Sequence, residues 1–474
     1  MQNTENHTNR NSVLLITTVI SFLVPFMASG LNIALPTIGE EFNLDVIFLS
    51  WLTTIYILMS ASLLIPWGRL ADIHGRRRIF TIGTIIFTIG SILSFLSVNG
   101  FMLLVSRAIQ GIGGAATFAT CVAILTSEFP LAERGKVLGL NTAAIYLGLS
   151  TGPPIGGILT RYLTWKSIFI ICSAVSLIVV VITLCKLKPA AVRVQKEKFD
   201  LYGSIHFTLT LILLMLGVTL LSENTTIALW LIAAGIILGG LFFWRQNKTS
   251  QPLVNLNLFK KNRSFTFSNL AALVNYSAIW AVSFLLSLYL QYAKGFSPLT
   301  AGLIMITSPL CQAIISPIAG RLSDRVEPRL LSSIGMAISA LGIGLLIFLT
   351  QTTSVFYIIV SLGVLGFGYG LFSSPNTYAV MSSIDRQNLG MASATLGTMR
   401  QVGMMLSMAV ATVVFNLVIG RVEITPEYYP ALVTSERIIF AISTGLCIAA
   451  IFASLARGNI HDNDAEPSGN KVEL

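Results

Sequence analysis

The spacing of charged residues constrains this chain more than any other feature of its sequence. Charge-free stretches of membrane length recur: 29 residues lie between Arg10 and Glu40, and 30 lie between Arg263 and Lys294. A helix needs about 20 mostly apolar residues to cross a bilayer. Only 11% of the 474 residues are charged, whereas roughly a quarter are charged in soluble proteins. This pattern excludes a cytosolic globular enzyme, a disordered chain and a coiled coil.

We therefore predict an all-α polytopic membrane protein with fourteen transmembrane helices. Most connections between the apolar stretches are only a few residues long, so neighbouring helices should form antiparallel hairpins. The predicted spans are 13–35, 47–68, 79–98, 101–125, 137–160, 167–187, 201–221, 227–244, 265–292, 299–320, 330–349, 355–378, 390–418 and 438–456.

The basic residues predict the orientation of these spans. An even number of spans places both termini on one side of the membrane. If that side is the cytoplasm, 23 of the 30 Lys and Arg residues fall in inner segments and five in outer segments, as the positive-inside rule requires. The net charge of +10 is then a signal of topology and does not indicate nucleic-acid binding. We expect a multi-pass protein of the plasma membrane with both termini in the cytoplasm.

Residue types that serve catalysis or metal binding do not gather anywhere in the sequence. The five cysteines fall in apolar spans and the four histidines are scattered. No spacing indicates a metal site or a disulfide framework, and no Ser-His-Asp or phosphate-loop arrangement occurs. We expect no enzymatic activity, no cofactor and no metal ion.

A short motif of Gly-Arg-Leu, a small residue and Asp occurs twice, 252 residues apart, after the second and the tenth predicted spans. The repeat predicts an N-terminal six-helix half (1–188), an inserted helix pair with basic cytoplasmic linkers (189–263), a C-terminal six-helix half (264–456) and a polar tail (457–474). The residues that we expect to act in these two loops are Gly68, Asp72 and Arg76 in the first copy and Gly320, Asp324 and Arg325 in the second.

The expected role of the two loops is gating. Glycine lets two helices approach closely, and an Asp beside Arg residues can hold a charge-assisted contact that breaks and re-forms. The alternative is that the cluster Arg76–Arg78 only fixes the topology.

The duplicated loop resembles the signature of the major facilitator superfamily, and the resemblance covers almost the whole chain. Segments 107–115 and 148–157 look like the fourth-helix motif and the antiporter-associated fifth-helix motif of that family. Segment 289–302 is similar to the seam between helices in the fourteen-helix drug:proton antiporter branch, which segments 32–36 and 400–403 also fit. The resemblance implies two six-helix halves plus two inserted helices, working by alternating access around a central cavity.

Two arginines fall inside predicted spans, where a charge is costly and must find acceptors. The resemblance implies that Arg107, beside Gln110, handles protons or binds helix carbonyls near the cavity. The alternative is that Arg107 extends to the outer interface. Arg400 should lie near mid-membrane, where it has either a structural acceptor or an anionic ligand.

The fifth span carries a run of small residues. Gly148, Gly152, Gly156 and Gly157 place small residues on one helix face, and Pro153 interrupts the helical hydrogen bonds. The resemblance implies a hinge or a seal between the cavity and the outside, and the alternative is a helix-packing face.

Other polar and aromatic side chains could line the cavity, although each by itself is more typical of packing. The candidates are Asn32, Gln110, Asn141, Asn275, Gln291, Gln312, Asn376, Gln401, Tyr56, Tyr146, Trp280, Tyr289 and Tyr369.

The sequence also departs from the family pattern. Many relatives carry an Asp in the first helix where this chain has Met27, and no predicted span has an Asp or Glu near its centre. A buried carboxylate suits proton coupling and attracts cations, so its absence favours neutral or anionic substrates. Ile73 also replaces the basic residue that usually follows the loop Asp.

We predict a secondary active transporter of the multidrug type that exports amphipathic small molecules and draws on the proton gradient. Its partners would be a small-molecule substrate, protons and the lipid bilayer, without nucleic acid, and it would work as a monomer. Two alternatives stay open. One is an exporter of an anionic or lipid-like metabolite with weak or no proton coupling, and the other is a non-transporting membrane receptor or scaffold.

Overall fold

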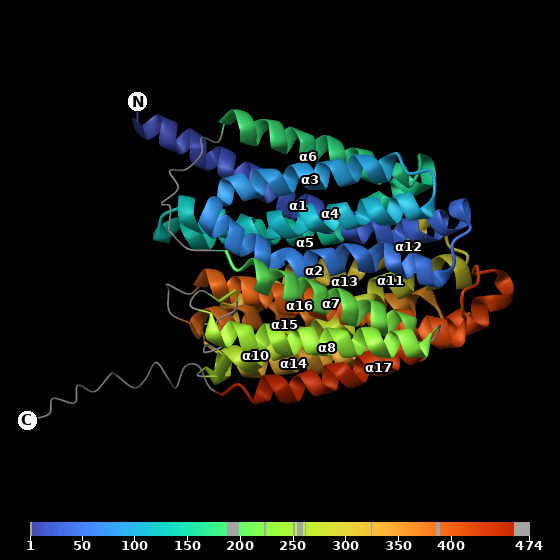
Figure 1. Cartoon of the computed structure of the whole chain (residues 1–474). Helices are drawn as coiled ribbons and strands as arrows, with labels where there is room; N and C mark the ends of the chain where they lie inside the picture. Colours follow the sequence, from blue (N-terminus) through green and yellow to red (C-terminus); the bar gives the residue numbers. More distant parts are fainter. Residues whose placement is uncertain are drawn as a thin grey trace, which may run out of the picture.

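The computed structural model folds into a bundle of long helices that run side by side (Figure 1). It describes residues 2–186, 199–221, 224–249, 252–253, 259–260, 262–323, 325–384 and 389–458. Every regular element within these ranges is a helix. The predicted all-α fold is confirmed.

The first half of the chain forms six long helices, and two more follow them. They are α1 (Gln2–Phe42), α2 (Val46–His74), α3 (Arg76–Phe95), α4 (Gly100–Glu128), α5 (Leu131–Tyr162), α6 (Lys166–Lys186), α7 (Leu201–Leu220) and α8 (Thr225–Lys248).

The second half is more interrupted. Its elements are α10 (Arg263–Ile279), α11 (Ala281–Leu288), the π-helix η1 (Tyr289–Ala293), α12 (Pro298–Met305), α13 (Thr307–Leu322), α14 (Pro328–Leu346), α15 (Val355–Ser382), α16 (Leu389–Val418), the short 3₁₀ helix η3 (Pro426–Tyr428) and α17 (Tyr429–Leu455).

Among the described residues, thirteen helical segments are long and apolar enough to cross a membrane. They include every predicted span except the fifth, which corresponds to the 32-residue helix α5. The ninth predicted span is a continuous stretch of α10, α11 and η1, and the tenth joins α12 to α13. The last span begins at Pro426, twelve residues before the predicted start at 438, and this difference matters for the functional site.

Polar side chains fix where many of these helices begin. The Asp45 carboxylate accepts the backbone N–H of Phe48 at 2.7 Å, and the Asn99 side chain accepts that of Met102 at 2.8 Å. Such caps satisfy N–H groups that the first helical turn leaves without partners. The other side chains that cap in this way are Asp200, Asn224, Asn262, Ser297 and Ser354.

The first residues of α1 and the last residues of α17 lie at the same end of the bundle (Figure 1). We call this the terminal end and the opposite one the far end. The loop between α2 and α3, which carries the Arg76–Arg78 cluster, also lies at the terminal end. The arrangement agrees with an even number of crossings.

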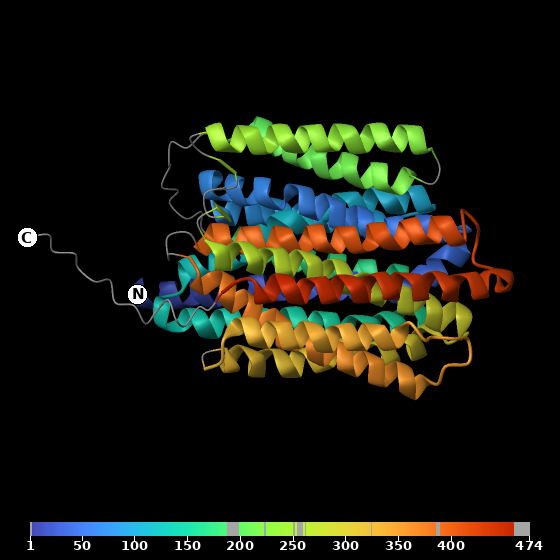
Figure 2. The same ribbon diagram turned by 90° about the horizontal axis from the view of Figure 1, so that it is seen from below.

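Helices α7 and α8 pair with each other at one edge of the bundle (Figure 2). Asp200, before α7, accepts from Arg245 at 3.1 Å and from Gln246 at 3.0 Å, both on α8. Burial raises the pKa of Asp200, but hydrogen bonds from Gly203 N–H, Gln246 and Arg245 outweigh it and lower the pKa overall. The ionised carboxylate of Asp200 therefore holds α7 and α8 together at the terminal end.

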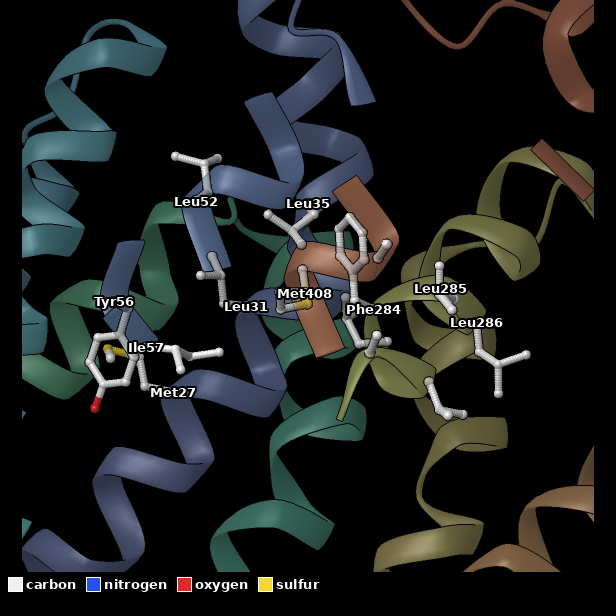
Figure 3. Close-up of a cluster of buried hydrophobic side chains, with 14 of the residues drawn as sticks. Met27, Leu31, Leu35, Leu52, Tyr56, Ile57, Phe284, Leu285, Leu286 and Met408 are labelled. Atoms are coloured by element: carbon white, nitrogen blue, oxygen red, sulfur yellow. The ribbon is translucent and has the colours of Figure 1, made fainter. Parts of the chain in front are cut away.

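The main hydrophobic core is shared by α1–α7, α10–α12, η1 and α14–α17. Figure 3 shows Met27, Leu31 and Leu35 of α1 beside Leu52 and Ile57 of α2, with Phe284 of α11 and Met408 of α16 close by. All of these side chains are at most 3% exposed. The halves are thus joined through apolar packing as well as through the polar contacts described next.

Candidate functional site

Arg107 lies in the interior, with 1% of its surface exposed. Its Nε donates to the Leu52 carbonyl at 3.2 Å, and its Nη1 donates to the Gln110 side chain at 2.6 Å. The guanidinium lies 4.5 Å from the centre of the Tyr56 ring. Arg107 therefore bridges α4 and α2 and does not extend to the interface.

Met27 occupies the position that faces this arginine. Its sulfur accepts from the Gln110 amide at 3.2 Å and lies 3.9 Å from Arg107 Nη1. Gln110 also donates to Ser91 at 2.8 Å. Among the described residues no carboxylate forms an ion pair with Arg107. The cation is held by a carbonyl, an amide oxygen, a ring and a thioether.

Arg400 lies where the two halves meet. Its Nη2 donates to Thr377 of α15 at 2.6 Å, and its guanidinium lies 5.6 Å from the centre of the Tyr276 ring of α10. Tyr146 of α5 and Tyr369 of α15 lie within electrostatic reach. Three tyrosines from three helices thus surround one cation, which has no carboxylate partner among the described residues. We call these four residues the Arg400 cluster.

A chain of hydroxyl groups extends the Arg400 cluster across the interface. Tyr146 donates to Ser373 at 3.3 Å and accepts from Ser316 at 3.2 Å, and Ser316 lies 2.8 Å from Ser374. Tyr146 belongs to α5 of the first half, whereas the serines belong to α13 and α15 of the second. The cluster is therefore assembled only when the halves are in contact.

Several buried polar atoms on the same helices lack a hydrogen-bond partner in the described structure. Buried polar atoms are nearly always paired, so such a concentration is typical of a place that takes up water or a ligand. These atoms include Arg400 Nε, both amide atoms of Asn275, Asn376 Oδ1 and Asn141 Oδ1. Four of the predicted candidates are thereby brought onto the helices that build the Arg400 cluster.

The small residues of α5 serve two different faces. A Cβ at Gly148 or Gly152 would collide with the backbone of α1, and one at Gly156 would lie 2.9 Å from Gly30 Cα. A Cβ at Gly157, by contrast, would lie 2.5 Å from the Pro298 carbonyl of α12. One face of α5 is therefore packed within the first half and the other is pressed against the second.

Pro153 lies on the face of α5 toward the second half. A Cβ at Gly302 of α12 would collide with the Pro153 carbonyl. Proline at 153 cannot donate a backbone hydrogen bond to the preceding turn. Helix α5 can therefore bend at this point when α12 moves. The predicted hinge or seal thus falls on a direct contact between the halves.

A further contact between the halves lies nearer the far end, where α11 and η1 meet α1. Asn32 Nδ2 donates to Ser283 at 3.2 Å, and Ser287 donates to the Asn32 carbonyl at 2.5 Å. Gln291 donates to the Ile33 carbonyl at 2.9 Å, and Tyr292 donates to the Pro36 carbonyl at 3.2 Å. We call these four hydrogen bonds the far-end gate.

The first predicted gating loop is built at the terminal end. Asp72 pairs with Arg76 at 3.2 Å, and Arg76 Nη1 donates to the Ala123 carbonyl of α4 at 3.1 Å. Arg77 pairs with Glu128 of α4 at 2.7 Å. Gly68 lies beside α4, where a Cβ would be 4.0 Å from that of Ala119. These contacts all stay within the first half.

The second loop is described only in part. Gly320 is close to α15, since a Cβ there would lie 3.7 Å from Ser374. Arg325 is exposed, and Asp324 lies outside the described residues.

The other candidates are divided between the interface and the core. Gln401 of α16 donates to Ser60 of α2 at 2.9 Å, which adds a third polar contact between the halves. Tyr289 is fully buried and donates to the Thr350 carbonyl at 2.5 Å. Trp280 lies at the break between α10 and α11 and packs on the core. Gln312 is 6% exposed on α13.

One buried carboxylate was missed by the sequence analysis. Glu436 of α17 is 0% exposed, and neither of its side-chain oxygens has a hydrogen-bond partner in the described structure. The predicted span began at 438, so the statement that predicted spans lack a central carboxylate overlooked a residue two turns inside α17. Pro430 near the start of α17 was the available signal, because proline is common in the first turn of helices.

Comparison with known proteins places the chain in a family. The family model described as Major Facilitator Superfamily matches residues 17–266 and 269–472. A riboflavin transporter, RibZ of Clostridioides difficile, is 35% identical, and the alignment covers 85% of this chain and 87% of that protein. The multidrug resistance protein Stp of Mycobacterium tuberculosis is 31% identical over 85% of this chain and 75% of its own length.

A third relative, the cephamycin export protein CmcT of Amycolatopsis lactamdurans, is 29% identical over 86% of this chain and 85% of its own length. The two matched ranges together cover nearly the whole sequence and include the helices described above. This chain is a multi-pass membrane protein and belongs to the major facilitator superfamily of transporters.

Proposed function

We propose that this protein exports amphipathic small molecules across the plasma membrane by alternating access, without changing them chemically, and that the proton gradient drives the export. The observation that carries the proposal is the Arg400 cluster, because it combines groups from both halves with buried polar atoms that lack partners. A rocking motion of the halves would build and dismantle such a site. Relatives named as a multidrug resistance protein and an export protein also support the proposed export of small molecules.

The proposed orientation places the terminal end in the cytoplasm and the far end outside. Its support is the strong bias of basic residues toward the segments at the terminal end. We further propose that a single copy is sufficient for transport, since both halves of the site lie within one chain.

The function is tested with purified protein in proteoliposomes that carry an imposed pH gradient. We expect gradient-dependent movement of at least one of three fluorescent probes: riboflavin, which is planar and neutral, the cation ethidium and the anion fluorescein. Movement of all three that ignores the gradient would contradict proton antiport, and movement of none would contradict export of this class of compound.

An anionic or lipid-like substrate with weak or no proton coupling is the second candidate. The observation that favours it is that buried Arg107 and half-buried Arg400 have no carboxylate partner among the described residues, with Met27 in the position that faces Arg107. A charge-assisted hydrogen bond contributes roughly 1.5–3 kcal/mol. An acidic group at Arg400 would gain this contribution.

The two candidates are separated by Arg400→Gln. We expect this variant to weaken binding of fluorescein at least tenfold, because the charge is lost, while ethidium binding changes little. Arg161→Gln, at an exposed position of α5, is the matched control. Equal weakening of both probes would place Arg400 in a structural role.

A further inference from the structure

Glu436 lies in a surrounding that is unfavourable to a charge. Its neighbours along α17 include Leu432, Val433 and Phe440, all buried in the main core. An ionised carboxylate without a partner in such a place would cost several kcal/mol. In the arrangement described here the carboxyl group is therefore protonated.

The groups that face Glu436 offer no compensating charge among the described residues. Its helix packs on α10, α14, α16 and η1. The group within electrostatic reach is Tyr289 of η1, whose hydroxyl is occupied by the Thr350 carbonyl. On its own helix, the next residue, Arg437, is exposed and donates to the Ile347 carbonyl at 2.8 Å.

The remaining titratable and charged groups on the packed elements are placed along their helices as follows. Arg263 and Arg329 begin α10 and α14 at the terminal end, Tyr276 and Arg400 lie near the middle of the bundle, and Tyr292 of η1 points to α1.

Tyr289 connects this carboxyl group to the far-end gate. The π-helix η1 spans Tyr289–Ala293, so Tyr289, Gln291 and Tyr292 belong to a single wide turn. Gln291 and Tyr292 hold α1 across the interface, while Tyr289 lies toward Glu436 and the loop after α14. A π-helical turn is uncommon and often marks a functional position. Movement of η1 away from α1 would therefore change the surroundings of Glu436 directly.

We propose that Glu436 is a proton-binding site that controls the far-end gate. When η1 leaves α1 and water enters from the external side, the carboxyl group loses its proton to that water. When the gate closes again, the carboxylate takes one proton from external water and becomes neutral as it is buried. The proposal rests on the transport function proposed above, because it places this proton release and uptake in the opening and closing steps of alternating access. Both occur at the external side, so Glu436 regulates the gate and carries no net proton across the membrane.

The test measures opening of the gate without a transport substrate. Ser287→Cys places a thiol at a fully buried gate position, and a membrane-impermeant maleimide is applied to intact cells between external pH 5.5 and 8.5. Labelling above that of the parent, which keeps its five cysteines, reports opening. Formation of the reactive thiolate itself rises with pH. At each pH we therefore divide the labelling rate of the Ser287→Cys protein by that of the same protein carrying Glu436→Gln as well.

We expect this ratio to be close to one at pH 5.5 and to rise at least fivefold by pH 8.5, because only the native carboxyl group can ionise. A ratio that stays constant would overturn the proposal. Glu427→Gln, an exposed carboxylate just before α17, is the matched control and should give a flat ratio. Glu436→Asp keeps a titratable group and should retain the rise of labelling with pH. If Glu436→Asp instead labels like Glu436→Gln, that result would also count against the proposal.

The outcome is distinguishable from a failure of the proposed function. If the labelling ratio rises with pH but no probe moves in proteoliposomes, the gate is proton-controlled and the assigned transport function is wrong. If probes move with the pH gradient but the ratio is flat, the proton acts elsewhere.

Discussion

At the scale of single residues, the two arginines within the apolar spans, buried Arg107 and half-buried Arg400, have different surroundings. Arg107 uses its donors on a backbone carbonyl and on Gln110, inside one half. Arg400 has Nη2 on Thr377 but leaves Nε without a partner, at the boundary between the halves. Because Nε and Nη1 of Arg107 are both occupied, this arginine favours stability, whereas the unpartnered Nε of Arg400 can donate to a ligand. The contrast is why we place the substrate at Arg400.

The methionine beside Arg107 leads to a prediction. Met27→Asp would put a carboxylate where a sulfur now lies 3.9 Å from Arg107 Nη1. We expect the variant to remain folded, because the new charge is paired, and to gain at least a threefold higher rate of ethidium export with stronger dependence on the pH gradient. Thermal unfolding and proteoliposome transport measure the two effects.

The control for this substitution is Leu31→Asp, one helical turn further along α1. Leu31 is 1% exposed and lies in the apolar core, so its carboxylate would be buried without a partner and should cost several kcal/mol. Comparable losses of stability in the two variants would show that Arg107 does not compensate a charge at position 27.

The sequence indicates that a charge within a long apolar stretch must find acceptors, and Arg107 has them in the Leu52 carbonyl and Gln110. Its expected role in proton handling stays a prediction. Glu436 was missed for a physical reason: it lies near a helix end, where a carboxylate is usually exposed to water. Only the fold reveals that η1 and α14 cover that end. Partners such as Thr377 for Arg400 also depend on contacts between segments far apart in the chain.

At the scale of elements, α5 is built as a two-sided helix. Its glycines at 148, 152 and 156 bring the backbone against α1, and Gly157 brings it against α12. The existence and order of most helices followed from hydropathy alone, since thirteen of the described segments are long and apolar enough to cross a membrane. Which face of α5 meets which neighbour did not follow, because a helix that is apolar on all sides carries no periodic signal.

Two glycines of α5 give opposite predictions for the same substitution. Gly152→Ala would force a Cβ into Ser29 and the Phe26 carbonyl, and such overpacking costs about 1–3 kcal/mol. Gly139 has nothing within 4 Å of an added Cβ, so Gly139→Ala should stabilise by about 0.5–1 kcal/mol, because alanine is favoured in helices. Thermal unfolding in detergent measures both, and a similar shift for the two would contradict the close packing of α5 on α1.

At the scale of the whole molecule, the contacts between halves gather toward the far end and the middle. The far-end gate and the α5–α12 contact join the halves there, and the Arg400 cluster and Gln401 join them at mid-depth. The described arrangement is therefore one in which the far end is closed. Which contacts hold in one state and break in another is a property that the sequence does not encode locally.

Locking this arrangement should stop transport. We expect that cross-linking Asn32→Cys to Ser283→Cys with a short bifunctional thiol reagent lowers probe export at least tenfold, since the native pair lies 3.2 Å apart across the gate. Reagents that form a reducible link allow activity to be restored by dithiothreitol.

The matched control joins two helices of one half. Thr88 of α3 and Ser176 of α6 lie 2.9 Å apart, and a cysteine pair at these positions should cross-link without a comparable effect on export. Inhibition by both links would indicate that rigidity within a half limits transport, and inhibition by neither would argue against a moving gate.

The α7–α8 pair has a kinetic consequence. Helix α7 contacts both α2 and α16, and Thr208 donates to the Ser62 carbonyl of α2 at 3.0 Å. If the two halves rotate against each other, this helix cannot keep both neighbours unchanged. Each turnover must then include a sliding step at one surface of α7. The activation barrier of this step depends on side chains that do not contact the substrate. Substitutions on that surface would alter the speed of the cycle while leaving affinity as it is.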